Sequence, residues 1–523
     1  MKTRIVKYLL TMSFILVTTI SFSQYQNVMI SESGASVSEP SICINPQNTN
    51  QLVAGSNLNK YYISEDGGYS WTQNTLTSPQ YGVWGDPCIV VDTAGDFYFL
   101  HLADPSSGSW IDRIVSQKFD FNTYEWTDGT YMGLNGIKAQ DKEWAVVDSA
   151  TNTIYVTWTQ FDEYGTANPN KYSNIHFSKS TDAGQTWSEA LQINKISGDC
   201  VDEDNTTEGA VPAVGPNGEI YVAWAGPAGI VFDKSYDGGN TWLDEDIFIN
   251  DQPTGWNYNI PGISRANGLP ITCCDISPSE YNGTIYVNWS DQRNGVDDTD
   301  IWISKSTDGG DTWSEALRVN NDPPGKQQFF TWMTIDQTNG EIIIVFYDRR
   351  DYDNNNTDVF IARSKDGGNT FENVKISESP FMPSSSVFFG DYTNITAHDG
   401  KIRPIWARAD GISMSIWTAI IDVTTDIAKP TQQMPFSLAQ NYPNPFREST
   451  YISYKLRNTS MVTLSVYDIY GRQVAVIVNN KNMEAGKYIE QFNATRFNIH
   501  SGVYYFTLQI GNVIKKQKMI LVD

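Results

Sequence analysis

The sequence predicts an all-β chain, a seven-bladed β-propeller followed by a small Ig-like β-sandwich. Three observations carry this prediction. A short motif recurs along most of the chain, strand-like segments separate its copies, and the last part, from about residue 436, has a strand pattern of its own. With 523 residues, 40% apolar and 13% aromatic, the chain is long enough to bury more than one core.

The recurring motif is S-x-D-x-G-x-T-W in its commonest form. Its copies are SEDGGYSW (64–71), STDAGQTW (180–187), SYDGGNTW (235–242), STDGGDTW (306–313) and SKDGGNTF (364–371), with a degenerate copy at FDFNTYEW (119–126). Their closing aromatic residues lie on average 60 residues apart, since 300 residues separate the first from the last over five intervals. That period fits one four-stranded blade with its loops.

The segments between the copies alternate strand-like runs with turn residues. WAVVDSATNTIYVTW (144–158) is followed by NIHFSKS, VPAVGPNGEIYVAW (211–224) by GIVFDKS, and GTIYVNWSDQRNG (283–295) by DIWISKS. Counting such pairs gives seven units, which begin near Ser41, Pro87, Trp144, Val211, Ile271, Trp332 and Thr393. Six blades are the alternative if the second, degenerate unit is something else.

The seventh unit lacks a recognisable fourth strand. Residues 26–34, QNVMISESG, resemble the fourth strands of other units, LQINKISGD and LRVNNDPPG. We therefore expect the N-terminal strand to complete the last blade and to remove the free edges of the ring.

The aspartates of the motif predict a turn rather than a site. Asp side chains accept backbone N–H bonds within their own loop, and the glycine allows a positive φ. A feature repeated in five blades is typical of scaffold, so we assign a structural role to its aspartates: Asp66, Asp182, Asp237, Asp308 and Asp366.

The chain begins with the pattern of an export signal. Lys2, Arg4 and Lys7 precede a short apolar run that ends in small residues, which predicts a signal peptide over residues 1–23. No later run reaches about 18 apolar residues, so we expect a soluble extracytoplasmic protein without a transmembrane segment. Five cysteines leave at least one unpaired, and no CxxC, HExxH, GxSxG or P-loop motif occurs.

Charge divides the chain in two. Residues 24–430 carry 23 basic and 55 acidic side chains, net −32, whereas residues 431–523 carry 10 and 5, net +5. The acidic part excludes nucleic acid as a partner. No cofactor is evident, but two Asp-rich loops, 199–205 and 351–358, are candidates for calcium, with solvated loops as the alternative.

Two resemblances follow from these motifs. S-x-D-x-G-x-T-W resembles the Asp-box, or BNR repeat, of sialidases, which implies a propeller with these turns on the face away from the ligand. NYPNPF, YDIYGR and SGVYYFTL, with a Lys-rich final strand, resemble the C-terminal sorting domain of type IX secretion. The implied domains are a propeller over 24–421, a linker over 422–435 and a sorting domain over 436–523, in a protein that is secreted or held at the outer surface.

Four acids are candidate catalytic residues: Asp86, Glu143, Glu208 and Asp391. Each precedes the first strand of a unit, as Glu39 does, so we expect them around the mouth of the central channel, where crowding raises some pKa values. The alternative is that each bonds the backbone of a neighbouring blade.

The loops on that face contain candidate substrate-binding residues. Asp291 with Arg293 and Asp348 with Arg350 repeat in adjacent units, and Arg408 occupies a related place. These arginines are candidates to bind a carboxylate, with a local Asp–Arg pair as the alternative. The less repetitive segments add Trp84, Trp256, Tyr258 and Arg265 as a glycan pocket, with loop packing as the alternative.

The resemblance to sialidases transfers no catalytic residue. Those enzymes use three arginines, one in an early RIP-type motif, but the first unit here, SEPSICINPQN, contains no arginine. The predicted function is to engage extracellular glycan or glycoprotein, by hydrolysis or by binding alone. The alternative is a non-catalytic propeller for protein interaction or adhesion.

Overall fold

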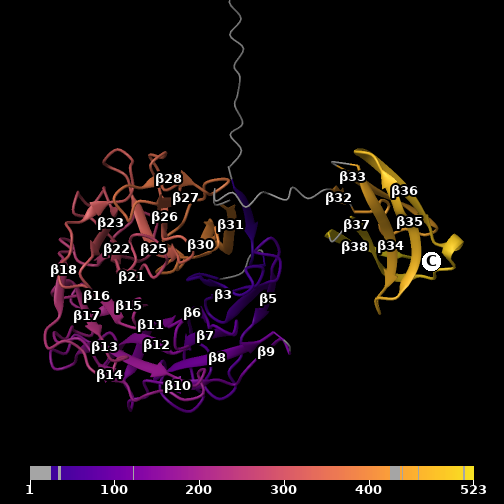
Figure 1. Cartoon of the computed structure of the whole chain (residues 1–523). Coiled ribbons are helices and arrows are strands. Elements are labelled where there is room, and N and C mark those ends of the chain that lie inside the picture. Colours follow the sequence, from indigo (N-terminus) through magenta and orange to yellow (C-terminus); the bar gives the residue numbers. More distant parts are fainter. Residues whose placement is uncertain are drawn as a thin grey trace, which may run out of the picture. The chain divides into compact units, whose positions relative to one another are not determined.

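The computed structural model describes residues 25–32, 37–121, 123–423, 436–438, 440–456, 459–510 and 513–522. The chain forms two compact units, Met1–Thr424 and Thr425–Asp523 (Figure 1). The predicted signal peptide and residues 424–435 of the predicted linker lie outside the described residues. All described regular elements except one short 3-10 turn are strands, so the prediction of an all-β chain is confirmed.

The first unit contains seven large antiparallel sheets within its described residues. In chain order, the first sheet contains β2 (Ser41–Ile44), β3 (Leu52–Ser56), β4 (Lys60–Ser64) and β5 (Thr72–Thr75), and the second contains β6 (Gly85–Val91), β7 (Phe97–Leu102), β8 (Ile114–Asp120), β9 (Glu125–Trp126) and β10 (Thr130–Met132). The third sheet contains β11 (Ala139–Val147), β12 (Ile154–Phe161), β13 (Ser173–Ser180) and β14 (Leu191–Gln192). The fourth contains β15 (Glu208–Val214), β16 (Ile220–Gly226), β17 (Gly229–Ser235) and β18 (Ile247–Asn250).

The remaining three sheets complete the set. The fifth sheet contains β21 (Ile271–Cys274), β22 (Ile285–Asp291), β23 (Asp300–Ser306) and β24 (Leu317–Arg318). The sixth contains β25 (Gln328–Asp336), β26 (Glu341–Asp348), β27 (Asp358–Ser364) and β28 (Glu372–Lys375). The seventh contains β29 (Asn394–His398), β30 (Lys401–Asp410) and β31 (Ser413–Asp422) together with β1 (Gln26–Met29). A two-stranded hairpin, β19 (Asn257–Tyr258) with β20 (Ala266–Asn267), lies between the fourth and fifth sheets.

The first strands of the seven sheets form the inner ring. β2, β6, β11, β15, β21, β25 and β29 each contact the next in this order, and β29 contacts β2 again. Figure 1 shows the sheets radiating from this ring, from indigo to orange. The ring is therefore a propeller, and the space enclosed by the first strands is its central channel.

The N-terminal strand closes the ring. β1 pairs with β31 in antiparallel register, Gln26 with Ile420 and Met29 with Trp417. Asn27 also bonds the preceding sheet, since its side chain donates to the Ile376 carbonyl at 2.8 Å. The prediction that the N-terminal strand completes the last blade is confirmed.

The second repeat unit, which contains the degenerate motif, also forms a sheet of its own. β8 pairs with β9 across it, Phe119 opposite Trp126, and β10 adds a further outer segment beside β8. The closing tryptophan packs against Phe99 and Phe119, with ring centroids 5.8 and 5.0 Å apart. Its aromatic position thus keeps the packing role although the aspartate is lost.

The repeated motifs are self-contained turns between the third and fourth strands. In the copy at 180–187, Oδ1 of Asp182 accepts the Thr186 backbone N–H at 2.9 Å and the Ser180 hydroxyl at 2.8 Å, and Oδ2 accepts the Thr186 hydroxyl at 2.6 Å. These bonds lower the pKa of Asp182 to about 2. Asp66, Asp237, Asp308 and Asp366 accept the same set of bonds.

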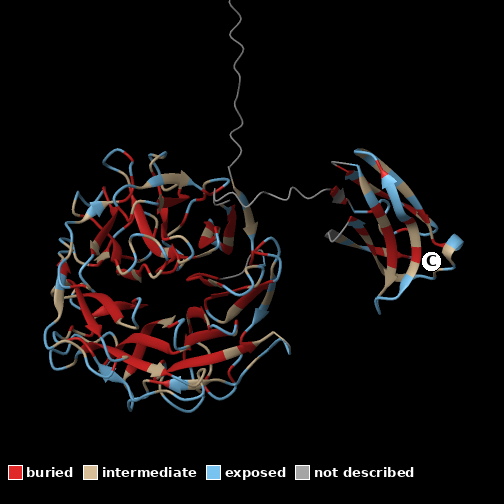
Figure 2. Cartoon of the chain, viewed as in Figure 1, coloured by how far each residue is buried: buried red, intermediate tan, exposed pale blue. Residues whose placement is uncertain are grey.

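These turns lie at one end of the channel. In the first sheet Ile44, at the end of the inner strand, pairs with Leu52, which pairs with Ser64 at the start of the motif. The motifs therefore lie where the inner strands end, and the candidate acids lie where the inner strands begin. Figure 2 shows that buried residues concentrate on the strands of the sheets, while many exposed ones lie in the loops.

The second unit is a small β-sandwich, as predicted. One sheet contains β32 (Phe436–Leu438), β33 (Ser449–Leu456) and β36 (Gly486–Asn493), and the other β35 (Gln473–Met483), β34 (Ser460–Asp468), β37 (Gly502–Ile510) and β38 (Val513–Leu521). A 3-10 turn, Thr495–Phe497, follows β36. Ile452, Leu464 and Phe506 are fully buried in its core.

Candidate functional site

The mouth of the channel where the inner strands begin is built by β-bulges. Register shifts interrupt β6, β11, β15 and β25 just after they start. Asp86, Lys142 and Phe330 lie in these bulges with φ of 53°, 52° and 50°, a conformation that non-glycine residues adopt at a cost. Because a bulge re-aims side chains, charged residues reach the channel there. We call this end the polar mouth.

Lys142 is the centre of the polar mouth. Its buried ammonium lies 3.0 Å from Asp86 Oδ2 and 2.8 Å from Asp391 Oδ2. Burial alone lowers the pKa of an ammonium, but Asp391, Asp86 and Asp141 outweigh it and hold the pKa of Lys142 well above its usual value. The sequence interpretation missed this lysine, although it directly precedes Glu143.

Arg265 is the second cation of the polar mouth. Its guanidinium binds Asp391 through both oxygens, with Nε at 2.9 Å from Oδ1, and its Nη1 lies 3.1 Å from Asp202 Oδ2. Burial alone would raise the pKa of Asp391, but Lys142 and Arg265 outweigh it and hold that pKa well below its usual range. Asp391 is therefore ionised and pairs with two cations. Its position in the sequence did not indicate these two ion pairs.

Glu39 braces three sheets rather than facing a ligand. Its carboxylate accepts the backbone N–H of Asp391 at 3.1 Å and a bond from the Asn57 amide. The amide oxygen of Asn57 in turn accepts the backbone N–H of Asp86 at 2.8 Å. Burial and then Asp86 raise the pKa of Glu39 well above its usual value. This contact is the backbone-bonding alternative considered for these acids.

Glu143 and Glu208 are buried beneath the mouth. Within the described residues, both oxygens of Glu143 and Oε2 of Glu208 are buried without a hydrogen-bond partner. Burial raises the pKa of both carboxyls well above the usual value, followed by the charges of Asp86 for Glu143 and Asp202 for Glu208. The shift of both is thus opposite in direction to that of Asp391.

Asp141 is an acid that the sequence interpretation did not single out. It directly precedes Lys142 in the bulge and accepts the Lys142 backbone N–H at 2.9 Å. Burial raises the pKa of Asp141 to about 7, with Lys142 opposing and Asp86 and Asp202 adding to the shift. A carboxyl with a pKa near 7 can exchange a proton near neutral pH.

Aromatic side chains line one side of the polar mouth. Trp84 and Trp110 are 38% and 42% exposed, and their rings meet edge to face at 5.6 Å. Trp110 contacts Tyr164 at 5.5 Å, and the Tyr164 hydroxyl donates to Asp202 at 2.7 Å. On the Arg265 side, the exposed Phe388 ring lies 5.5 Å from the guanidinium. We call Trp84, Trp110, Tyr164, Arg265 and Phe388 the aromatic rim.

Trp256 and Tyr258 do not belong to this rim. They are 5% and 6% exposed. The Trp256 indole donates to the Thr206 carbonyl at 3.1 Å, and the Tyr258 hydroxyl donates to the Asn267 carbonyl at 2.9 Å. Both rings thus hold the β19–β20 hairpin, which presents Arg265. The loop-packing alternative describes them better than stacking on a ligand.

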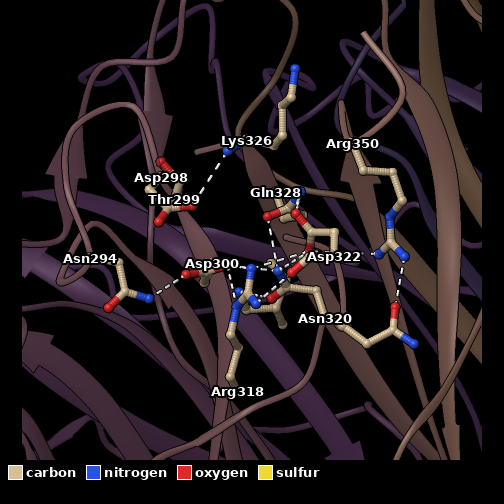
Figure 3. A network of polar contacts seen from close by, with 12 residues as sticks. Asn294, Asp298, Thr299, Asp300, Arg318, Asn320, Asp322, Lys326, Gln328 and Arg350 are labelled. Atoms are coloured by element: carbon tan, nitrogen blue, oxygen red, sulfur yellow. Dashed lines mark hydrogen bonds and ion pairs between the residues drawn. The ribbon is translucent and has the colours of Figure 1, made fainter. Parts of the chain in front are cut away.

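The arginines of the repeated loops form local pairs. Arg293 Nη2 lies 2.6 Å from Asp291, Arg350 Nη2 lies 2.7 Å from Asp348, and Arg408 Nε lies 3.0 Å from Asp410. Arg350 also borders a buried network that joins the fifth and sixth sheets, where Asn320 donates to both Asp300 and Asp322 at 2.7 Å (Figure 3). These three arginines are committed to neighbouring protein atoms.

Several carboxylates of the two Asp-rich loops accept hydrogen bonds from protein donors. Asp202 binds Tyr164 and Arg265, Asp204 accepts the Asn257 backbone N–H at 2.8 Å, and Asp358 accepts the Ser377 hydroxyl at 2.7 Å. Among the described residues, no group of three His, Cys, Asp or Glu side chains has the arrangement of a metal site. Calcium binding by these loops stays a prediction.

Comparison with known proteins bears mainly on the second unit. Residues 440–522 match the secretion system C-terminal sorting domain. No curated protein matches the chain. Solved structures with a similar backbone include a protein of unknown function from Dyadobacter fermentans DSM 18053 (TM-score 0.45, 11% identity, 77% of this chain and 99% of that one).

Two further solved structures are a polysaccharide lyase described as an ulvan lyase (TM-score 0.47, 12% identity, 76% of this chain and 96% of that one) and the NanB sialidase from Streptococcus pneumoniae (TM-score 0.43, 10% identity, 72% and 84%). These likenesses are distant in sequence and in backbone, so the propeller assignment rests on the sheets of this chain.

The motifs of the second unit fit the sorting-domain match. SGVYYFTL lies on β37, which pairs with β34 on one side and the Lys-rich β38 on the other. In the described residues no helix has the length and apolar character needed to cross a membrane. The chain thus ends in a type IX secretion sorting domain, and the protein is exported to the cell surface or secreted.

Proposed function

We propose that the exported propeller binds extracellular glycan at the polar mouth, with the aromatic rim as the contact surface. The observation that supports this most is the combination of exposed aromatic rings with fixed polar groups on one mouth. Aromatic rings stack on the apolar faces of sugars, and fixed polar groups bond the hydroxyls. Trp84, Trp110 and Phe388 supply the rings, while Arg265 and Asp202 supply the polar groups.

The charge balance of the mouth favours an uncharged sugar. Lys142 and Arg265 are both paired with carboxylates, so neither cation is free to bind an acidic sugar. The surrounding propeller is strongly acidic and repels polyanions. A neutral glycan avoids both costs, because its hydroxyls both donate to carboxylates and accept from the guanidinium.

The same geometry favours binding over hydrolysis. A glycosidase needs two carboxyl groups on either side of a bound sugar. Here Asp391 is held by two cations, and Glu143 and Glu208 are buried beneath the mouth. The cavity between Lys142, Asp391 and Trp144 has only about 20 Å³, which is room for a water molecule rather than a sugar ring.

Glycan-array binding of the mature protein tests this proposal. We expect binding to neutral glycans, and we expect Trp110→Ala to weaken it at least tenfold because one stacking ring is lost. Tyr236→Ala, which removes an exposed ring at the opposite end, is the matched control and should leave binding unchanged. Turnover of any bound glycan, lost in Asp141→Asn, would show that the site is catalytic instead.

Capture of a protein partner without any glycan dependence would favour the alternative of an interaction propeller. The converging charges of Lys142, Arg265 and Asp391 argue against it, because a flat protein-binding face has no need for ion pairs buried in its centre. Deglycosylation of the captured partner separates the two cases.

A further inference from the structure

The opposite end of the channel contains a larger cavity. It has a volume of about 640 Å³ and lies where the inner strands end. All seven inner strands contribute their last residues to its lining, among them Ile44, Val91, Val147, Val214, Ile335 and Ala397. We call this end the apolar mouth. It shares the end of the propeller with the repeated turns and is separate from the proposed glycan site.

The cavity is closed on its inner side. Trp144 of β11 and Trp332 of β25 come from opposite sides of the ring, yet their ring centroids lie 4.2 Å apart. Tyr392, which precedes β29, packs against Trp144 at 4.9 Å. Rings that meet across the axis fill the channel between the two mouths. These rings therefore lie between the apolar mouth and the polar mouth.

The lining contains no lysine or arginine among the described residues. Gln337, one of its polar residues, already donates to the Cys274 carbonyl at 2.8 Å and accepts the Ile276 backbone N–H at 2.9 Å. Asp92 accepts the Tyr98 hydroxyl at 2.9 Å and the backbone of its own turn. Half-buried His398 and the side chains of Gln47, Ser149 and Thr334 also line the cavity and can bond a polar group of a ligand.

We propose that the apolar mouth binds an uncharged, mainly apolar small molecule. A concave, mostly apolar pocket of a few hundred to about 1,000 Å³ is the usual form of a small-molecule site. Water held against these aliphatic side chains makes few hydrogen bonds, so an apolar ligand displaces it favourably. A carboxylate would enter without a lysine or arginine to pair with and close to Asp92, which disfavours fatty acids relative to neutral ligands of the same length.

Fluorescence titration of the mature protein with N-phenylnaphthylamine, an uncharged apolar dye, tests the proposal. We expect saturable binding that Ala397→Phe weakens at least tenfold, because the new ring occupies the cavity. Ala190→Phe, the same change at an exposed position outside the cavity, is the control and should bind the dye like the parent. Cys273→Phe fills the cavity from β21 and serves if Ala397→Phe does not fold.

Competition distinguishes the ligand class. At about pH 8, where a carboxylic acid is ionised, we expect dodecanol to displace the dye at least tenfold better than dodecanoate does. Equal displacement by the two would overturn the assignment to uncharged ligands. Dye binding that both folded Phe variants retain would overturn the site itself. Trp110→Ala should not affect dye binding, so failure of the glycan proposal and failure of this one are separate results.

Discussion

At the polar mouth, Lys142 is the side chain that Asp86 and Asp391 share. Both carboxylate oxygens contact one buried ammonium, so they lie no further apart than the sum of the two contact distances, 3.0 and 2.8 Å. Without that ammonium, two acids would face each other in a poorly solvated place. The lysine thus makes the acid cluster compatible with a stable fold.

Replacing this lysine should therefore destabilise the propeller. We expect Lys142→Met to lower the free energy of unfolding by about 3 kcal/mol, because one partner of a buried ion pair is removed. Urea denaturation of the parent and the variant measures the difference. Lys171→Met, which breaks the exposed pair with Glu163, is the control and should change stability by less than about 1 kcal/mol. Equal effects would contradict the role given to Lys142.

Asp141 should make the stability of the propeller depend on pH. Its pKa is about 7 in the folded protein, whereas an unfolded aspartate has a pKa of about 3.9. Between these values the folded state binds more protons than the unfolded chain. The contribution of Asp141 to stability is therefore complete below about pH 4 and is lost as the pH rises through about 7.

The variant Asp141→Asn isolates this contribution. Because asparagine does not ionise, we expect the variant to be more stable than the parent at about pH 8, by on the order of 2 to 4 kcal/mol, with a smaller difference at about pH 4. Chemical denaturation at several pH values measures both. Asp244→Asn at an exposed position should follow the parent at every pH. A constant difference between Asp141→Asn and parent would contradict the pKa shift.

Among the elements, the repeated turns also tie neighbouring blades together. A cation on the third strand of one sheet donates to a glycine carbonyl in the turn of the next: Lys179 to Gly238 at 2.6 Å, Lys234 to Gly309 at 2.8 Å and Lys305 to Gly367 at 2.7 Å. In the last sheet Arg403, on the second strand, donates to Gly67 of the first at 2.7 Å. The motif therefore helps to close the ring as well as each hairpin.

Arg403 should be the most important of these cations. It is fully buried, and its guanidinium also donates to the carbonyls of Ile402 and Ile421. We expect Arg403→Met to cost about 3 kcal/mol of unfolding free energy, since buried carbonyls lose their donors. Lys305→Met, at a more accessible copy, should cost about 1 kcal/mol or less. Denaturant titration of both variants measures the two losses of unfolding free energy. A larger loss in Lys305→Met than in Arg403→Met would contradict the importance given to Arg403.

The sequence predicts the elements that follow a local pattern, but it does not predict the direction of individual side chains. The repeated turns and the alternating strands are local patterns, so the sheets and the closing N-terminal strand followed from them. The direction of a side chain in a bulge shifts with a single residue. For this reason Lys142 reaches the mouth while Glu143, the next residue in the same bulge, does not, and the direction of neither side chain could be predicted from the sequence. Trp256 and Tyr258 are buried because they belong to the β19–β20 hairpin, which is not part of the repeated pattern and was therefore not predicted.

The strand that closes the ring lies directly after the predicted signal peptide. The predicted mature chain begins near Gln24, and β1 begins at Gln26. Without β1 the last sheet has only three strands, and β31 becomes an open edge. The strand that closes the ring is therefore the first one after the predicted signal peptide, far in sequence from its partners Trp417 to Ile420.

Deleting residues 24–31 should open the ring. We expect the deletion to lower the melting temperature and to promote aggregation, because it removes the strand pairing with β31 and the bonds of Asn27 to Ile376 and Glu378. A synthetic peptide of residues 24–34 should restore the melting temperature by adding as the missing strand. The same peptide with Val28→Pro loses a ladder donor and should not restore it. Full stability of the deletion, or rescue by both peptides alike, would show that ring closure does not depend on this strand.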